Sequence, residues 1–278
     1  MRTEGDQRIV VFATVADRKM VRWVKVGGEK LRGLEWADDD NVMITTSITD
    51  SLYGFSGERF MLRVYSLSRN EVRSLPGNVL QIDDTNHILN AVFGDVMVGH
   101  IDGHTVVFVS GVDLTLGAQL YRCDLTTRST KVFRAYDESS ASWLVDAHGE
   151  LAAEQDYDAQ TQRWSIRIFH GGSSREAVSG HAALDVPQVL GFGPTPDTLL
   201  VQSVENGARS WKLLSTDDGK LSAPMADDAV VDEAMHDPLT LRLIGGVNIV
   251  DMREYVFLDP LLESRWKSVV KAFDSATE

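Results

Sequence analysis

The segment YRCDLTTRSTKV, at Tyr121–Val132, combines a strand that ends on an apolar residue, a polar turn and the start of a second strand. Five similar phrases occur along the chain: WVKVGGEKL at Trp23–Leu31, RVYSLSRNEV at Arg63–Val72, IRIFHGGSSREAV at Ile166–Val178, WKLLSTDDGKL at Trp211–Leu221 and YVFLDPLL at Tyr255–Leu262. The steps between equivalent positions are 41, 58, 44, 45 and 43 residues, counted at Val26, Leu67, Leu125, Phe169, Leu214 and Phe257. A period in this range, built from short strands, is typical of a β-propeller. The sequence therefore predicts an all-β fold, a β-propeller of four-stranded blades with about six repeats.

Short runs rich in β-branched and aromatic residues surround these phrases and are bounded by Gly, Asp, Asn or Pro. They predict strands over Ile9–Thr14, Val42–Thr46, Phe60–Tyr65, Val96–Val98, Thr105–Ser110, Arg163–Phe169, Leu199–Ser203 and Leu241–Gly245. Tight hairpin turns are predicted where Gly follows Asp or Asn, at Asp102-Gly103, Asn206-Gly207 and Asp218-Gly219.

A second phrase, an apolar pair followed by a polar turn and an apolar strand, begins at Gly33, Trp143, Val189 and Ala234. We expect its turn to join the outer strand of one blade to the inner strand of the next. The longest step, from Leu67 to Leu125, contains extra residues, part of which we expect in a loop around Gln81–Leu89. Insertions in a propeller lie in loops on its faces.

The C-terminus breaks the strand pattern. Asp259 followed by Pro260 is typical of a helix N-terminus, with Asp as the cap and Pro at the first helical position. Apolar residues then follow at helical spacing on one face, namely Leu262, Trp266, Val269, Val270 and Phe273. The sequence thus predicts a propeller over residues 1–258 and an amphipathic linker helix over 259–278. The apolar face either folds back on the propeller or connects to a domain outside this chain.

The composition is that of a soluble globular protein, with 278 residues of which 43% are hydrophobic and 24% are charged. There are 41 acidic and 27 basic residues, so the net charge is −14. The negative charge either keeps the protein soluble or, alternatively, lines an acidic funnel that attracts cationic peptides. No basic cluster suits phosphates, and no apolar run reaches the ~20 residues that span a membrane, so neither nucleic acid nor membrane is an expected partner. No secretory signal opens the chain, and cytoplasm and periplasm both remain open.

The sequence contains no motif that would position a catalytic nucleophile. The G-x-S-x-G elbow of serine hydrolases is absent, and Gly54-Phe55-Ser56-Gly57 is one residue too short, so a plain loop is the better interpretation. No His can be given a triad role without a nucleophile. We therefore assign no catalytic residue and no cofactor-binding residue to this chain.

The acidic and His-rich segments are better explained as turns than as metal sites. His100 and His104 could face each other across a turn and bind zinc, but two exposed histidines beside a turn is the favoured interpretation. Asp38-Asp39-Asp40-Asn41 lacks the ligand spacing of a calcium loop and is expected to be a solvated interblade turn. The same interpretation is given to Asp146, His148, Glu150, Asp156 and Asp158. No metal ligand is assigned.

Tryptophans and the single cysteine are expected in the core. The distribution of Trp23, Trp36, Trp143, Trp164, Trp211 and Trp266 is that of blade-packing aromatics, with peptide or sugar stacking by one or two of them as the alternative. Cys123 cannot form an internal disulfide and is expected to be a small core residue.

Several segments together resemble a known family. They are WLVDAHGE at Trp143–Glu150, DYD at Asp156–Asp158, LIGG at Leu243–Gly246, YVFLDP at Tyr255–Pro260 and the R-W-x-x-V-x-K-A-F helix from Arg265 to Phe273. This pattern resembles the N-terminal propeller of bacterial serine peptidases of the prolyl oligopeptidase family, in the dipeptidyl- and acylaminoacyl-peptidase-like branch. The resemblance extends over essentially the whole chain and is most specific from Trp143 to Phe273.

The resemblance implies a non-catalytic part of a larger peptidase. In that family the propeller covers an α/β-hydrolase domain with a Ser-Asp-His triad and admits only short peptides. The hydrolase domain, in the same parent chain or in trans, would contact Leu262, Trp266, Val270 and Phe273 of the helix. A homodimer is a further expectation from the family. The alternatives are a free-standing propeller that serves as a protein-interaction scaffold, and a propeller enzyme with a central metal.

Overall fold

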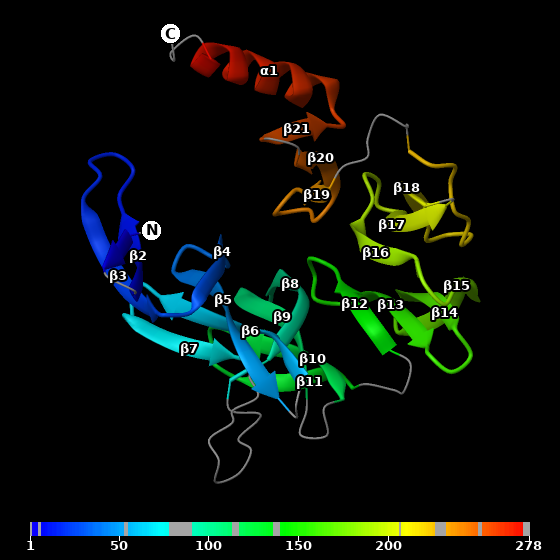
Figure 1. Cartoon of the computed structure of the whole chain (residues 1–278), viewed down its shortest axis with the longest axis horizontal. Coiled ribbons are helices and arrows are strands. Elements are labelled where there is room, and N and C mark those ends of the chain that lie inside the picture. The colour runs from blue at the N-terminus through cyan, green and yellow to red at the C-terminus, as the bar shows by residue number, and fades with distance from the viewer. Residues whose placement is uncertain are drawn as a thin grey trace. The chain divides into compact units, whose positions relative to one another are not determined.

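Antiparallel strands that pair with their neighbours in the sequence make up most of the molecule (Figure 1). The structure is a computed structural model that describes residues 2–4, 7–52, 55–77, 91–112, 117–135, 140–205, 207–225, 232–249 and 252–274. The chain divides into two compact units, Met1–Asp137 and Glu138–Glu278, and each is described by itself. The predicted loop around Gln81–Leu89 lies outside the described residues.

The first unit contains a three-stranded sheet and two four-stranded groups. The three-stranded sheet consists of β1 (Arg2–Glu4), β2 (Gln7–Ala13) and β3 (Met20–Gly27). The second group consists of β4 (Lys30–Trp36), β5 (Asn41–Leu52), β6 (Phe55–Ser66) and β7 (Glu71–Leu75). The third consists of β8 (Val92–Ile101), β9 (His104–Val112), β10 (Ala118–Asp124) and β11 (Thr130–Ala135). Phe60 of β6 pairs with Val92 of β8 and links the last two groups into one eight-stranded sheet.

The second unit contains three sheets and the helix. The four-stranded sheet consists of β12 (Ser140–Val145), β13 (Leu151–Asp158), β14 (Arg163–His170) and β15 (Ser173–His181). The next consists of β16 (Gln188–Phe192), β17 (Thr198–Glu205) and β18 (Ala208–Ser215). The last consists of β19 (Glu233–His236), β20 (Leu243–Ile249) and β21 (Arg253–Phe257), and α1 (Pro260–Asp274) follows it.

These sheets have the arrangement of propeller blades. In each, consecutive strands run up and down, joined by short turns, and the chain then proceeds to the next sheet. The predicted all-β propeller fold with one C-terminal helix is therefore confirmed. The proposed domain boundary between residues 258 and 259 stays a prediction.

The first recurring phrase forms the expected two-stranded hairpin in the middle of the chain but not at the two ends. It forms the hairpins β6–β7, β10–β11 and β14–β15. At Trp211–Leu221 the second strand is reduced to a single bridge between Leu214 and Leu221. At Trp23–Leu31 the second strand, β4, pairs with β5 and not with β3. At Tyr255–Leu262 a helix replaces it.

The interpretation of the second phrase was wrong. Its turn does not join two blades. It forms the hairpins β4–β5, β12–β13, β16–β17 and β19–β20, each inside one sheet. The physical reason is that a short polar turn between two strands brings them into antiparallel contact, whereas passage to another sheet needs no such pairing.

The predicted tight turns are confirmed where the structure describes them. Asp102 and Gly103 have φ values of 51° and 77°, as a two-residue hairpin turn between β8 and β9 requires. Gly219 has a φ of 75° and donates its N–H to the Ser215 carbonyl at 3.0 Å. Asn206 lies outside the described residues. Ser56 and Gly57, expected in a loop, belong instead to strand β6, opposite Ser51 and Asp50.

Apolar side chains of adjacent sheets pack on one another within each unit. In the first unit, one cluster joins the sheet β1–β3 to the strands β4–β6, and its buried members are Val10, Phe12, Val26, Val42, Ile44 and Tyr65. In the second unit, a cluster joins the sheets β12–β15 and β16–β18 through Ala153, Trp164, Ile166, Ile168, Leu199, Val201 and Leu214. Another joins β16–β18 to β19–β21 through Leu200, Trp211 and Leu243.

The tryptophans divide into two groups. Trp143, Trp164 and Trp211 are buried, which confirms their predicted role in blade packing. Trp23 and Trp36 are 50% and 60% exposed, so the prediction that they lie in the core was wrong. Trp23 lies on β3 and Trp36 on the edge strand β4. The Trp36 ring still contacts the neighbouring sheet, edge-on to Phe12 of β2 with ring centroids 6.2 Å apart.

Gln155 links two sheets of the second unit by hydrogen bonds. Its amide nitrogen donates to the Pro187 carbonyl at 2.6 Å, and its amide oxygen accepts the Val189 N–H at 3.1 Å. The side chain is buried, so both backbone groups would lose their partner without it. Buried polar groups left without partners cost about 1–3 kcal/mol.

We therefore expect Gln155→Ala to lower the free energy of unfolding of the second unit by about 1–3 kcal/mol. Urea unfolding followed by tryptophan fluorescence measures this change. The matched control is Gln160→Ala. Gln160 is an exposed turn residue that bonds to Asp158 through its backbone N–H, which the substitution retains. Equal stability of the two variants would contradict the bridging role.

Cys123 is a core residue, as predicted, because its side chain is buried among apolar neighbours. Burial raises the pKa of the Cys123 thiol to about 11. The thiolate is the reactive form, so native Cys123 should react with thiol reagents far more slowly at pH 8 than the unfolded chain does.

Labelling with a chromogenic disulfide, with and without denaturant, tests this expectation. The control combines Cys123→Ser with Ser174→Cys, since Ser174 is exposed on β15 and a thiol there should react at once. Rapid labelling of native Cys123 would show that the core around it opens readily.

Candidate functional site

Helix α1 begins as the sequence predicts. The Asp259 carboxylate accepts the Leu261 N–H at 2.8 Å, and the Asp259 carbonyl accepts the Glu263 N–H at 2.9 Å. Pro260 occupies the first helical position, where no intrahelical N–H is needed. The helix is thus fixed at its N-terminus by a capping residue.

The first half of α1 is anchored on strand β21. The Trp266 ring lies edge-on to the Tyr255 ring, with centroids 5.1 Å apart, and 6.3 Å from the Phe257 ring. A carboxylate oxygen of Glu263 accepts the Phe257 N–H at 2.9 Å. This bond, followed by the ion pair with Lys267, lowers the pKa of Glu263 below its usual value.

The second half of the apolar face is not covered in the same way. Leu262 and Trp266 are partly buried, whereas Val269 and Val270 are exposed and Phe273 is 72% exposed. At about 1.5 Å per residue, Phe273 lies about 10 Å beyond Trp266 along the helix axis. The predicted helical face is confirmed, and only its N-terminal half packs against the sheet. We call Val269, Val270 and Phe273 the overhang.

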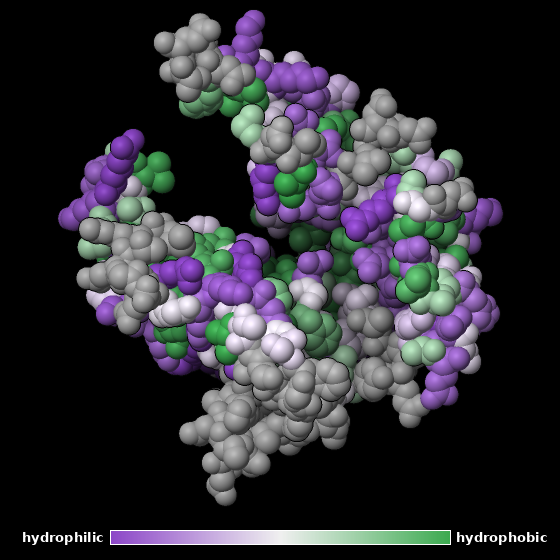
Figure 2. All heavy atoms as spheres, in the orientation of Figure 1, coloured by the Kyte–Doolittle hydropathy of each residue, from purple (hydrophilic) through white to green (hydrophobic). Residues whose placement is uncertain are grey.

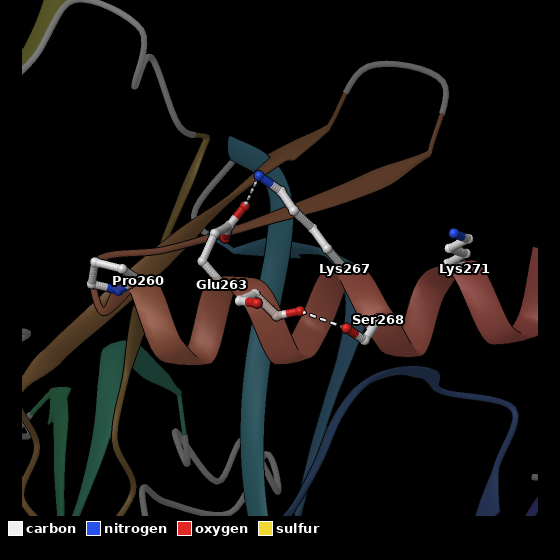
Figure 3. Close-up of a pocket in the computed structure, with 6 residues that line it drawn as sticks. Pro260, Glu263, Lys267, Ser268 and Lys271 are labelled. Atoms are coloured by element: carbon white, nitrogen blue, oxygen red, sulfur yellow. Dashed lines mark hydrogen bonds and ion pairs between the residues drawn. The ribbon is translucent and has the colours of Figure 1, made fainter.

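A polar strip runs along another side of the same helix (Figure 3). It borders a surface hollow of about 380 Å³ lined by Pro260, Glu263, Ser264, Lys267, Ser268 and Lys271. The Glu263–Lys267 ion pair and the bond from the Ser268 hydroxyl to the Ser264 carbonyl lie in this strip. Because all six residues belong to one helix, they form an open surface and not the walls of a cavity.

The two histidines of the metal hypothesis lie on opposite faces of their hairpin. His100 is opposite Thr105 and His104 is opposite Ile101, and residues directly opposite each other share a face. Adjacent pairs alternate between faces, so the two rings point away from each other. His104 instead bonds to the Asp124 carboxylate at 2.8 Å. Among the described residues, no group of three or more His, Cys, Asp or Glu side chains is placed to hold a metal.

The acidic run at residues 38–41 is a turn, as predicted, but it connects β4 to β5 inside one sheet and not two blades. The Asp38 carboxylate accepts the backbone N–H groups of Asp40 and Asn41 at 2.8 and 2.7 Å. The Asp40 carboxylate accepts the Ser66 hydroxyl at 2.6 Å and the Ser68 N–H at 2.7 Å. Both carboxylates are therefore engaged in holding the turn.

Asp146 is a turn residue, in agreement with the sequence, and Asp158 is the last residue of strand β13, where its carboxylate holds the turn that follows. The Asp146 carboxylate accepts the N–H groups of His148 and Glu150, both at 2.9 Å. The Asp158 carboxylate accepts the backbone N–H groups of Thr161 at 3.1 Å and of Gln160 at 2.8 Å, and hydrogen bonding, first from Thr161 and then from Gln160, lowers the Asp158 pKa.

The interpretation of Asp156 as a turn residue was wrong. Asp156 is buried in strand β13, opposite Ser165 of β14. Glu154, two residues earlier on the same strand face, is also buried. Arg167 lies between them, 3.9 Å from the Glu154 carboxylate and 3.5 Å from that of Asp156. Charge pairing within the sheet, which sequence spacing alone does not reveal, accounts for this acidic pair.

The residues of β21 that contact the helix were not identified from the sequence. Tyr255 and Phe257 carry the ring contacts to Trp266, and Glu263 supplies the hydrogen bond. Their signal was present, because alternate aromatic residues just before a capped helix mark a strand face that the helix can cover.

No helix of the described residues is long and apolar enough to cross a membrane. Comparison with family models gives no match, and comparison with curated proteins gives none either.

Solved structures give weak matches to propeller-containing proteins. TolB from Acinetobacter baumannii is 16% identical, with a TM-score of 0.42 over 77% of this chain and 47% of its own. The acylaminoacyl peptidase of Pyrococcus horikoshii is 11% identical, with a TM-score of 0.43 over 83% of this chain and 40% of its own. The β-propeller domain of the Trilobed protease from Pyrococcus furiosus is 9% identical, with a TM-score of 0.37 over 83% of this chain and 78% of its own.

This chain thus spans less than half the length of the first and the second of these structures. At such identities and scores the matches assign no activity. The strand order and hairpin connections of the chain itself define its class, a β-propeller protein with a C-terminal helix.

We expect Trp266→Ala to release α1 from β21, because the ring contacts to Tyr255 and Phe257 are lost. Tryptic cleavage after Arg265 or Lys267 should become at least about tenfold faster, which corresponds to about 1.4 kcal/mol of local stability.

The matched control for this experiment is Phe273→Ala. Phe273 lies on the same helical face but is largely exposed, so its removal should leave the cleavage rate unchanged. Equal cleavage rates in the two variants would show that the ring contacts do not anchor the helix.

Proposed function

We propose that this chain is the non-catalytic propeller portion of a serine peptidase, and that the overhang of α1 contacts an α/β-hydrolase domain. The observation that carries the proposal is the division of one helical face into an anchored half, at Trp266, and an exposed half, at the overhang. The choice of an α/β-hydrolase domain as the partner comes from the resemblance to prolyl oligopeptidase propellers, which is strongest from Trp143 to Phe273.

The anchored half explains why α1 can serve as a connector. Trp266 and Glu263 hold the helix on β21, so the direction of the overhang is fixed before a partner arrives. A preformed surface loses less conformational entropy on binding than a free peptide does. Covering a Val or Phe side chain contributes about 1.5–3 kcal/mol when burial is complete.

Charge around the overhang specifies the partner surface further. Arg265, Lys267 and Lys271 lie on the same helix, and Asp274 is the one acidic residue between Arg265 and the helix end. Lys267 is paired with Glu263 within the helix. A hydrolase surface suited to α1 would therefore have an apolar hollow with carboxylates at its rim.

In this proposal the propeller controls which peptides reach the active site of the hydrolase domain and takes no part in bond cleavage. The hydrolase domain supplies the nucleophile, the base and the oxyanion donors, and the propeller admits short peptides while it excludes longer polypeptides. The substrate class is set by size, and the net charge of −14 favours the approach of cationic peptides.

The experiment begins with the coding sequence around this chain and with any separately encoded hydrolase that co-purifies with it. The complex should hydrolyse short chromogenic peptides and leave a long unstructured substrate intact. Val270→Asp together with Phe273→Asp should weaken the contact between the propeller and the hydrolase by tenfold or more, because charge enters an apolar interface. Activity on the long substrate should rise in that variant.

The control is Ser264→Asp with Ser268→Asp, which adds the same charge to the polar strip of α1 and should change neither binding nor selectivity. A hydrolase domain that binds equally well to both double variants contradicts the role of the overhang. A natural partner without a G-x-S-x-G segment contradicts the peptidase assignment and favours an interaction scaffold.

A further inference from the structure

Arg73 is a half-buried arginine of the first unit with no carboxylate partner among the described residues. It lies on β7 opposite Val64, and Val64 belongs to the apolar cluster shared by the groups β4–β7 and β8–β11. Residues directly opposite each other share a face, so Arg73 points toward the group that contains β10, at the margin of that cluster. Within the described part of the chain, its guanidinium group makes no hydrogen bond and no ion pair.

Two further arginines lie within electrostatic range of Arg73. Arg69 belongs to the turn between β6 and β7, and Arg128 belongs to the turn between β10 and β11. Burial first, and then the positive charge of Arg128, lower the pKa of Arg73, and Arg69 acts in the same direction. At the thiol of Cys123 on β10, where burial raises the pKa, the charge of Arg73 acts in the opposite direction. The guanidinium group of Arg73 therefore lies near both hairpins.

Glu71 is the carboxylate that acts on Arg73, and it is already paired with another arginine. It accepts a hydrogen bond from Arg128 at 2.5 Å, which joins the two hairpins. Among the described groups that act on this site, three guanidinium groups thus share one carboxylate. The excess positive charge is held where water is partly excluded. A partly buried charge without a partner is unfavourable, and an anion that binds there would remove this cost.

The chemistry of the group favours phosphate over a carboxylate. Each guanidinium group has five N–H donors in a fixed fork that matches the oxygens of an anion. A carboxylate can satisfy one such fork, whereas a phosphate group has further oxygens for a second arginine and a charge of about −1.5 to −2 at pH 7. Around β7 the visible surface is largely hydrophilic (Figure 2), as expected where a small ion enters from solvent.

We propose that Arg73, together with Arg69 and Arg128, binds a phosphate group at the margin between the hairpins β6–β7 and β10–β11. Arg73 supplies a bidentate contact, and the two turn arginines supply charge and further N–H donors. The ligand is either free inorganic phosphate or the phosphoryl group of a larger molecule. The site lies wholly within the first unit, so binding depends neither on a hydrolase partner nor on the overhang of α1.

The test is phosphate binding by the purified full chain, measured by isothermal titration calorimetry at constant ionic strength. The wild-type chain should bind inorganic phosphate saturably below about 10 mM. Arg73→Gln should weaken binding at least about tenfold, because a charge-assisted bidentate contact is lost. Glu71→Gln should tighten binding several-fold, because it removes the carboxylate that competes for Arg128.

The matched control is Arg163→Gln. Arg163 lies on strand β14 and is paired with Glu176 at 2.6 Å, so the substitution removes the same charge without removing an unpaired donor group. This variant should bind phosphate like the wild type. Thermal unfolding in phosphate and in sodium chloride of equal ionic strength gives a second measurement. Phosphate should raise the Tm of the wild type and of Arg163→Gln more than that of Arg73→Gln, because a ligand stabilises the state that binds it.

Phenyl phosphate distinguishes the two sources of the ligand. Equal affinity for phenyl phosphate and inorganic phosphate assigns the site to the phosphoryl group of a larger molecule, whereas affinity for inorganic phosphate alone assigns it to the free ion. Three results would overturn the proposal. They are a wild-type chain that binds neither probe saturably, an Arg73→Gln variant with wild-type affinity, and an equal loss of affinity in Arg163→Gln, which would show that only net charge matters.

Discussion

Each sheet of this protein presents apolar side chains that another sheet must remove from water. The sheet β12–β15 buries Ile166 and Ile168 against Leu199 of the following sheet, and that sheet in turn buries Trp211 beside Leu243 of the next. A meander of three or four strands cannot bury such a face by itself. Every sheet therefore depends on its neighbour, and this dependence sets both the order of the strands and the position of the core.

The same dependence makes the two ends of the repeat the places where function can arise. At the C-terminal end α1 takes the place of a further sheet, and Trp266 covers Tyr255 and Phe257. At the N-terminal end the outer face of β3 keeps Trp23 half exposed. Within each unit the sheets bury apolar faces against one another, whereas Trp23 and the overhang of α1 keep apolar surface exposed that another molecule could contact.

The sequence predicted those parts of the fold that local chemistry determines. Turn residues such as Asp102-Gly103 fix a hairpin through their own φ values, and the cap at Asp259 fixes the start of the helix. Pairing choices between distant strands were not predictable in this way. Strand β4 follows β3 after a short turn, yet it pairs with β5, which comes after a longer turn. The anchored and exposed halves of α1 could not be told apart either, because that division depends on Tyr255.

The positions of buried charged residues could not be predicted from the sequence either. They depend on partners that strand pairing brings together. Asp156 was predicted in a turn, but register places it opposite Ser165 and beside Arg167, inside the sheet. A buried carboxylate is tolerated only when it is paired and hydrogen-bonded, so its position is determined by its partners more than by its neighbours in sequence. Acidic residues of the turns, such as Asp38, instead bond to local backbone N–H groups. Much of the negative charge is thus engaged locally, in turns such as that of Asp38, in the pairing of Asp156 with Arg167 and at the helix cap Asp259.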